Sequence, residues 1–289
     1  MKKFIIDVST HQKEIDWAKI KSQNVEGAIL RVAYTGWGSL KTYIDAYFER
    51  NYSKVRAVSL PVGVYLYSSA ITEDEAIKEA QFVLKTLKGR HLDYPIFFDM
   101  EETNRTPVCQ TNVGKAQMSK VANAFCNHIL NNSKYMVGVY SFEDFLENSV
   151  DMSTVISQAY VWVAHYGQAE LSYKGRYDMW QYSSTKVLDG VSGHDGMVDT
   201  NFLYVDFNTD QETEIKETML LKCIKVSTSK GYPYRNKAGG AILGYYKVGD
   251  TIKVTNAYSY KKVANVGSAD AWFIDDKGNH FAFDKDYFN

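Results

Sequence analysis

The stretch Tyr94-Pro95-Ile96-Phe97-Phe98-Asp99-Met100-Glu101 predicts a short buried strand that ends in two carboxylates. Its run of apolar and aromatic residues is typical of a strand covered on both faces. Side chains alternate along a strand, so Asp99 and Glu101 point to the same side, separated by about 7 Å of backbone. Phe98 and Met100 point to the opposite side.

Two carboxylates at the end of an apolar strand are costly, because burial and like charge both oppose ionisation. One of them can then hold its proton near neutral pH while the other stays charged, an arrangement suited to glycoside hydrolysis. The alternative is a strand that simply emerges into solvent. This stretch alone leaves both interpretations open.

The bulk properties predict an ordinary globular protein of two domains, since 289 residues are long for one. The net charge of −1 argues against a nucleic-acid binder. The charge is unevenly divided: from Thr218 to Asn289, 10 Lys, 1 Arg and 6 Asp give +5, and the remainder carries −6. An acidic first part and a basic last part suggest separate roles.

Three cysteines without metal-ligand spacing indicate reduced thiols of a protein made in the cytoplasm. The apolar run after Met1 is too short for a signal peptide, and no stretch is long enough to insert into a membrane. We therefore expect a chain without an export signal of its own.

Strands and helices alternate in the first part of the sequence. Predicted strands fall at 4–9, 27–34, 60–68 and 94–101, then at 136–141, 159–166, 177–183 and 197–203. Five helices separate the first of these strands: one capped by Asp16, then 43–55, 72–87 (opened by a Thr72/Glu75 capping box), 113–130 and 143–146. The last three strands have no helices between them.

Eight strands with this alternation favour a closed barrel, in which active sites gather at the C-terminal ends of the strands. Asp7, Asp99, Glu101 and Asp199 all lie at or near such ends. In a closed barrel the first and last strands are neighbours. The four acids are therefore expected to share one rim.

The organisation predicted for the chain is a catalytic barrel at 1–208, a polar acidic linker at 209–219 and a small all-β domain at 220–289. The last part contains short strand-like runs separated by turn signals. Its twelve aromatic residues, among them Tyr245, Tyr246 and Trp272, together with its positive charge, suggest docking on an anionic, sugar-rich wall.

Seven motifs carry a resemblance to glycoside hydrolase family 25, the phage and bacterial muramidases. They occur in family order over roughly residues 4 to 205, and together they are specific. They are Asp7-Val8-Ser9-Thr10-His11-Gln12 with Ile15-Asp16-Trp17, Gly63-Val64-Tyr65, Asp99-Met100-Glu101, Gly138-Val139-Tyr140-Ser141, Trp162-Val163-Ala164-His165-Tyr166, Trp180-Gln181-Tyr182 and Val198-Asp199-Thr200-Asn201. The resemblance implies an irregular TIM-like barrel of five β/α units followed by three β-strands.

The resemblance implies that Glu101 is the general acid that protonates the leaving glycosidic oxygen. Asp99 would be a nucleophile, activate water, or orient the 2-acetamido group of the substrate for internal attack, the role we favour. Asp7 and Asp199 would stabilise positive charge in the transition state. Asp195 competes with Asp199, because the loop before Asp199 is longer than usual for the family.

Four aromatic residues near strand ends are candidates for stacking on sugars, with barrel core as the alternative: Tyr65, Tyr140, Trp162 and Trp180. Arg31, inside a strand, is expected to form a buried ion pair with one of the rim acids. His11 and His165 are expected to be structural. No cofactor or metal is expected, because no histidine accompanies the acids at ligand spacing.

The tail is similar to bacterial Src-homology-3-like wall-binding modules, so the whole chain resembles a phage endolysin. Such a protein would be made in the host cytoplasm, be released by a holin and act on peptidoglycan and anionic wall polymers. Two alternatives remain: a non-catalytic wall-binding protein on a glycosidase scaffold, and a metal hydrolase, which EDTA would inhibit.

Overall fold

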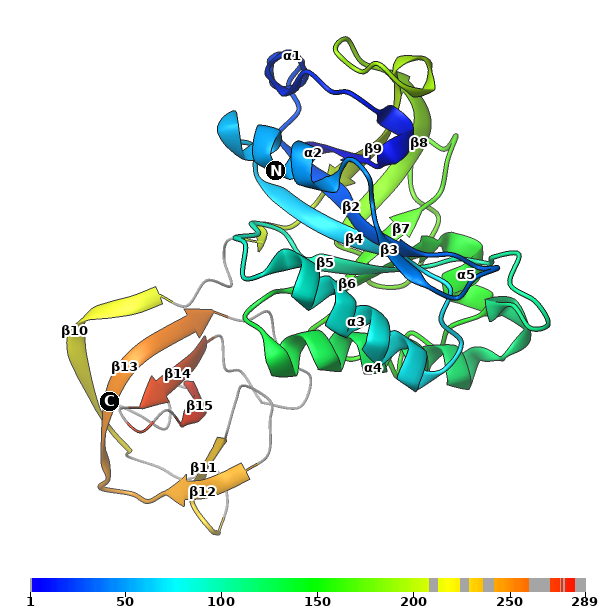
Figure 1. Ribbon diagram of the computed structural model, residues 1–289. Helices are drawn as coiled ribbons and strands as arrows, with labels where there is room; N and C mark the ends of the chain where they lie inside the picture. Colours follow the sequence, from blue (N-terminus) through cyan, green and yellow to red (C-terminus); the bar gives the residue numbers. More distant parts are fainter. Residues whose placement is uncertain are drawn as a thin grey trace. The chain divides into compact units, whose positions relative to one another are not determined.

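The computed structural model describes residues 2–207, 213–223, 229–235, 242–259, 271–275, 277 and 279–283 (Figure 1). The chain divides into two compact units, 1–207 and 208–289. No helix among the described residues combines the length and the apolar character needed to cross a membrane.

Eight strands of the first unit close into a barrel, as predicted. In spatial order they are β1 (Lys3–Val8), β2 (Gly27–Thr35), β4 (Val62–Ser68), β5 (Ile96–Met100), β6 (Val137–Phe142), β7 (Tyr160–Ala164), β8 (Met179–Val187) and β9 (Met197–Leu203). Pairing of β9 with β1 completes the circle. A ninth strand, β3 (Thr42–Ile44), adds antiparallel to the end of β2.

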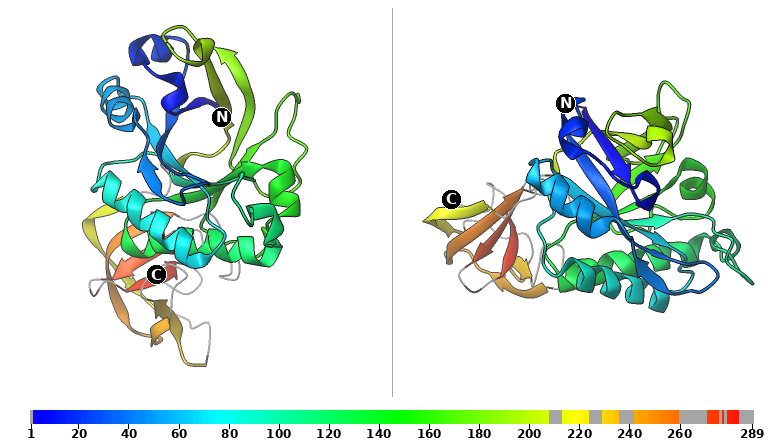
Figure 2. Two further views of the ribbon diagram at one scale, coloured as in Figure 1. Left: turned by 45° about the vertical axis from the view of Figure 1, so that its right-hand side comes forward. Right: turned by 45° about the horizontal axis from the view of Figure 1, so that its top comes forward.

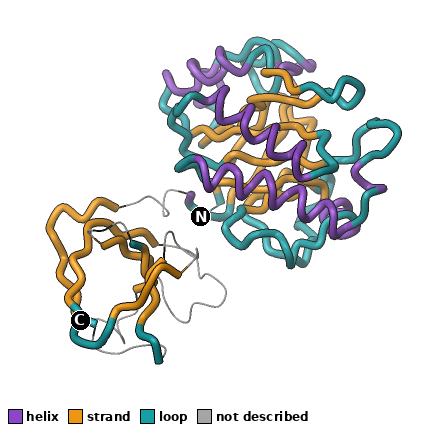
Figure 3. Tube along the Cα trace, turned by 60° about the horizontal axis from the view of Figure 1, so that its bottom comes forward, coloured by secondary structure: helices purple, strands orange, loops and turns teal. Residues whose placement is uncertain are grey.

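The α-helices follow the first five barrel strands, and no α-helix lies between β7, β8 and β9, all of which fall in the described residues 2–207; this confirms the predicted arrangement. They are α1 (Trp17–Ser22), α2 (Phe48–Ala57), α3 (Glu73–Leu87), α4 (Lys115–Asn132) and α5 (Glu143–Asn148). Figure 3 shows helices on the outside of the strands, and Figure 2 shows α3 beside α4. The barrel interior therefore stays free of helices.

Local sequence explains where two of these helices begin. Asp16 accepts hydrogen bonds from the backbone N–H groups of Ala18 and Lys19 and so caps α1. Thr72 and Glu75 form the predicted reciprocal capping box of α3. For α2, the helix between these two, the predicted start at Tyr43 is wrong: Tyr43 lies in β3, and α2 begins only at Phe48.

Strand β9 runs opposite to the rest of the barrel. The other seven barrel strands are parallel, whereas β9 pairs antiparallel with both β8 and β1. The start of β9, not its end, therefore lies at the rim where the parallel strands end. Asp199 reaches that rim from the third position of β9 and pairs directly with Asp7 of β1.

Alternation along the strands separates two hydrophobic clusters. Phe98 and Met100 belong to the cluster between strands and helices, as predicted, while Phe97 belongs to the smaller cluster inside the barrel with Trp162. Glycine allows the interior to close around Phe97, because a Cβ on Gly138 of the adjacent strand would lie 2.5 Å from its ring. Aromatic side chains thus fill the barrel below the carboxylates.

The second unit contains a six-stranded antiparallel sheet. Its strands are β10 (Thr213–Lys222), β11 (Tyr232–Arg235), β12 (Ile242–Tyr246), β13 (Thr251–Ser259), β14 (Ala271–Asp275) and β15 (His280–Phe283). Strand β10 occupies residues 213–219, which the sequence predicted as linker; residues 209–212 lie outside the described residues. Tyr246 is buried and donates to Asp275 Oδ2, so this ring belongs to the core and not to a docking surface.

Candidate active site

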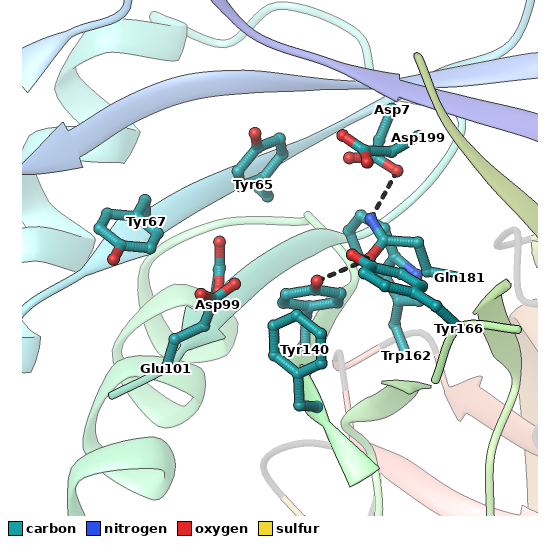
Figure 4. Close-up of a pocket in the computed structure, with 11 residues that line it drawn as sticks. Asp7, Tyr65, Tyr67, Asp99, Glu101, Tyr140, Trp162, Tyr166, Gln181 and Asp199 are labelled. Atoms are coloured by element: carbon teal, nitrogen blue, oxygen red, sulfur yellow. Dashed lines mark hydrogen bonds between the residues drawn. The ribbon is translucent and has the colours of Figure 1, made fainter. Parts of the chain in front are cut away.

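A cavity of about 250 Å³ opens at the rim where the parallel strands end (Figure 4). It is lined by Asp7, Tyr65, Tyr67, Asp99, Glu101, Tyr140, Phe142, Trp162, Tyr166, Gln181 and Asp199. All four acids predicted to share one rim line this single cavity.

Asp99 and Glu101 lie next to each other at the end of β5, as alternation along the strand predicts. Burial raises the pKa of both carboxyls. For Asp99, the charge of Glu101 and a hydrogen bond between the two carboxyls raise the pKa further. For Glu101, that bond opposes the effect of burial, and the pKa is raised to about 7. The pair therefore holds a proton at neutral pH.

One oxygen of Asp99 lacks a hydrogen-bond partner among the residues that the structure describes. The side chain is 3% exposed, and its Oδ1 finds no hydrogen bond among the described residues. A buried carboxylate oxygen in this state is costly unless a ligand supplies a donor. Asp99 can thus accept an N–H or O–H from a molecule in the cavity.

Asp7 is held by two amide side chains. Its Oδ2 accepts hydrogen bonds from Gln181 Nε2 at 2.9 Å and from Asn201 Nδ2 at 2.8 Å. Trp162 Nε1 donates to Asn201 Oδ1 at 2.8 Å and fixes that amide. Burial raises the pKa of Asp7 to about 6, although both amide bonds act in the opposite direction.

Asp199 lies directly across from Asp7 on the antiparallel pair formed by β1 and β9. Its pKa is raised to about 8, first by burial and then by the charges of Asp7 and Glu101. Asp195, its competitor in the sequence, is exposed in a 3₁₀ turn and does not line the cavity. The structure therefore places Asp199, and not Asp195, with the other acids.

Three of the four aromatic candidates line the cavity: Tyr65, Tyr140 and Trp162. Trp180 does not, and this is a correction. Its indole N–H donates to the backbone oxygen of His165, and its ring packs against Phe202 on the opposite face of the sheet. Side chains alternate along β8, and because Gln181 faces the cavity, the adjacent Trp180 faces the opposite side.

Arg31 also differs from expectation. It forms its ion pair with Asp45, at 2.8 Å, and not with one of the four rim acids. Asp45 is itself buried and accepts from the backbone N–H of Thr10. The charge of Asp99 still acts on Arg31, but Arg31 does not line the cavity.

Several polar groups of the site are not predicted from the sequence. Gln181 Oε1 accepts hydrogen bonds from Tyr140 at 2.8 Å and from Tyr166 at 2.7 Å, so one amide links two phenols to Asp7. Tyr67 lines the cavity two residues after Tyr65. Alternation along β4 could have identified Tyr67, because residues two apart on a strand face the same side.

The two motif histidines lie outside the cavity lining. His165 contacts Glu143 through Nδ1. His11 has a lowered pKa, first because of burial and then because of the charge of Arg31. Across the described ranges, no cluster of His, Cys, Asp and Glu side chains has the geometry to hold a metal ion.

The sequence model of Glycosyl hydrolases family 25 matches residues 6–191, which include three of the four acids. The autolytic lysozyme of Clostridium acetobutylicum is 25% identical over 190 residues, which cover 65% of this chain and 52% of that protein.

Solved structures show the same likeness. The modular autolysin LytC from Streptococcus pneumoniae has a TM-score of 0.60 and 28% identity, covering 70% of this chain and 47% of the autolysin. LytC has also been solved in complex with a synthetic peptidoglycan ligand. The spore cortex lytic enzyme SleM from Clostridium perfringens shares the fold over 97% of this chain and 95% of its own, with a TM-score of 0.61 and 15% identity. This chain spans about half the length of the clostridial lysozyme and of LytC.

Proposed function

The chain belongs to glycosyl hydrolase family 25, and from this premise we propose that it is an N-acetylmuramidase that cleaves the β-1,4 bond between MurNAc and GlcNAc in bacterial peptidoglycan. The observation that carries the proposal is the Asp99–Glu101 pair, which holds a proton at neutral pH inside a cavity lined by aromatic rings. The autolysin that binds a peptidoglycan ligand and the autolytic lysozyme support the choice of substrate.

Glu101 is the proposed general acid. Its pKa of about 7 lets it carry a proton at neutral pH and still release it to the leaving glycosidic oxygen. It is less buried than Asp99, so a bound glycan reaches it more easily. Once it has given up its proton, the carboxylate accepts one from the water that completes hydrolysis.

Asp99 is the proposed orienting group. Its unpartnered Oδ1 is free to accept the N–H of a 2-acetamido group, which turns the acetamido oxygen toward the anomeric carbon. Internal attack would then retain configuration without a sugar–enzyme adduct. NMR of the nascent reducing end, together with intact-mass measurement of the enzyme, distinguishes this route from direct attack and from inversion. An inverted first product would rule it out.

Asp7 and Asp199 are the proposed stabilisers of the positive charge that develops on the sugar. The two amides that hold Asp7 fix its carboxylate before substrate arrives. Preorganised charge of this kind needs no rearrangement during the reaction.

Mass spectrometry of peptidoglycan fragments tests the bond specificity. A new reducing-end MurNAc is expected after digestion. Free amino groups released by amide cleavage would overturn the proposal. Release of no fragments at all would favour the second candidate, a non-catalytic wall-binding protein on the same scaffold.

The second unit is the proposed wall-targeting module of an endolysin. Its support is the +5 charge of Thr218–Asn289 and the six-stranded sheet. As a phage endolysin, the protein would be made in the cytoplasm of the bacterial host and released to the cell wall by a holin.

A further inference from the structure

A row of aromatic residues crosses the sheet and continues beyond the cavity. Strand register aligns Tyr140 with Asp99, Asp99 with Tyr67, and Tyr67 with Tyr34. Tyr34 in turn pairs with Tyr43 on β3. Residues paired in this way project from the same face of a sheet. Tyr67 and Asp99 line the cavity, so Tyr34 and Tyr43 extend its aromatic wall outward along the edge strand.

The outer end of this row is open to solvent. Tyr43 is 41% exposed on β3, which Figure 1 shows alongside β2, and Trp37, in the turn between β2 and β3, is 47% exposed. Four of the ten exposed large hydrophobic residues in the described part of the chain fall between 37 and 44. A concentration of this kind beside a cavity marks a binding surface more often than chance exposure does.

Tyr34 and Tyr43 are held in place before any ligand binds. Their rings stack with centroids 5.6 Å apart and planes at 30°. The guanidinium of Arg31 lies over Tyr34, 5.2 Å from the ring centroid, and an ion pair with Asp45 holds Arg31 in place. Fixed rings lose little conformational freedom on binding, which favours affinity.

We propose that Tyr34 and Tyr43 form a remote subsite for the glycan chain, which binds sugars that lie beyond the cleaved bond. This inference rests on the proposed function and adds a determinant of preference for long chains. A cavity of about 250 Å³ is smaller than the roughly 300–1,000 Å³ of typical ligand sites, so a polymer must continue over the rim. Tyr43 lies three strands from Asp99, about 14 Å at the usual strand spacing.

The glycan fits this surface better than the stem peptide does. Tyr43 offers an exposed flat ring that Tyr34 holds in place, and the apolar face of a sugar can stack on such a ring. Among the described residues, the cation that lies over Tyr34 is Arg31, and it is already paired with Asp45, so this guanidinium is not free to select a peptide carboxylate. Stacking on the rings, not charge, is therefore the expected source of binding.

Tyr43→Ala in the full chain tests the subsite. Substrates are long uncrosslinked glycan chains freed of stem peptides by an amidase, and a tetrasaccharide prepared from them. The ratio of kcat/KM for long chains to kcat/KM for the tetrasaccharide should fall about tenfold, the loss expected for one stacking ring. Tyr43→Phe should preserve the ratio, because the ring remains. Tyr204→Ala, which removes a comparably exposed tyrosine beyond the end of β9, should preserve it as well.

Two results would overturn the subsite: an unchanged ratio in Tyr43→Ala, or a loss seen only on chains that keep their peptides. Measuring the affinity for glycan chains distinguishes failure of the subsite from failure of the proposed function. In a Glu101→Gln background, the Kd for long peptide-free chains should rise about tenfold with Tyr43→Ala, whichever bond the enzyme cleaves. Equal Kd values with and without Tyr43→Ala would reject the subsite, while fragments without reducing-end MurNAc would reject only the muramidase.

Discussion

At the scale of single residues, Glu101 carries the most direct prediction. Glu101→Gln keeps the shape of the side chain but removes its titrating proton. We expect kcat to fall by at least about 10²-fold, the low end for general acid catalysis, with KM nearly unchanged. Asp195→Asn is the matched control, because Asp195 is acidic, exposed and outside the cavity. A Glu101→Gln enzyme that keeps most of its activity on purified walls would contradict the assignment.

The same carboxyl predicts the pH dependence of activity. Glu101 must be protonated to act as an acid, and its pKa is about 7. Cleavage of a soluble fragment should therefore decline as pH rises through this value, approaching tenfold per pH unit. The measurement is kcat/KM from pH 5 to 9. A rate that stays level across the alkaline half of this range would mean that another group donates the proton.

Crowded acids also make stability depend on pH. The pKa values of Asp7, Glu101 and Asp199 are raised to about 6, 7 and 8, so the folded chain keeps protons that the unfolded chain releases. Their contribution to the free energy of unfolding is therefore full below about pH 4 and is lost as pH rises toward 8. Asp199→Asn should stabilise the protein at pH 8 by at least about 1 kcal/mol and by less at pH 5.

Denaturant unfolding followed by tryptophan fluorescence measures this difference, since four of the five tryptophans lie within residues 1–207. Asp195→Asn again serves as the control, with no gain expected. Equal effects of Asp199→Asn at both pH values would show that the carboxyl is not perturbed by its neighbours.

At the scale of elements, the caps and the barrel pattern could be predicted from sequence, because both depend on neighbours along the chain. Strand direction could not: the apolar pattern of 197–203 is the same for either direction, and β9 proved antiparallel. Inward and outward positions on β8 are equally undetermined from sequence, so the pattern does not show that Gln181 faces the cavity and Trp180 does not. The Arg31–Asp45 ion pair could not be predicted, because the sequence predicted a helix from residue 43 where the structure has β3 followed by Asp45.

Removing the capping box of α3 is expected to lower the stability of the protein without changing its catalytic activity. Thr72 accepts from the backbone N–H of Glu75, and Thr72→Ala leaves that donor without its partner. A loss of about 1 kcal/mol is expected, with Thr72→Ser close to wild type. Activity on soluble fragments at 25 °C should stay at the wild-type level. A stability equal to that of the wild type would mean that the cap contributes nothing.

At the scale of the whole molecule, the two compact units predict separable tasks. A chain that ends at Asn208 keeps all eight barrel strands, so it should cleave soluble fragments at about the full-length rate. It should lyse intact cells poorly, because tethering raises the local concentration of bonds. Lysis at the full-length rate would remove the targeting role.

The isolated unit 208–289 gives the complementary test, and it must start before β10 at Thr213. Its retention on purified walls should weaken with salt if charge carries it, since the screening length falls to about 3 Å at 1 M. The pull-down compares low and high salt, with and without teichoic polymers. No binding at low salt would reject the targeting proposal, and salt-insensitive binding would assign it to aromatic rings instead.

Closure of the barrel between β1 and β9 has a consequence for the order of folding. The hydrogen bond from Asn201 to Asp7 joins residues 194 positions apart, so the ends of this unit must meet before the site exists. Contacts between residues so far apart in the sequence form slowly. During synthesis, Asp7 lacks its hydrogen bond from Asn201 until the last barrel strand has left the ribosome. A nascent or partly refolded chain is thus expected to contain Asp99 and Glu101 without hydrolysing glycans. In refolding from denaturant, activity should return with the slowest phase, after the helices have regained their circular dichroism.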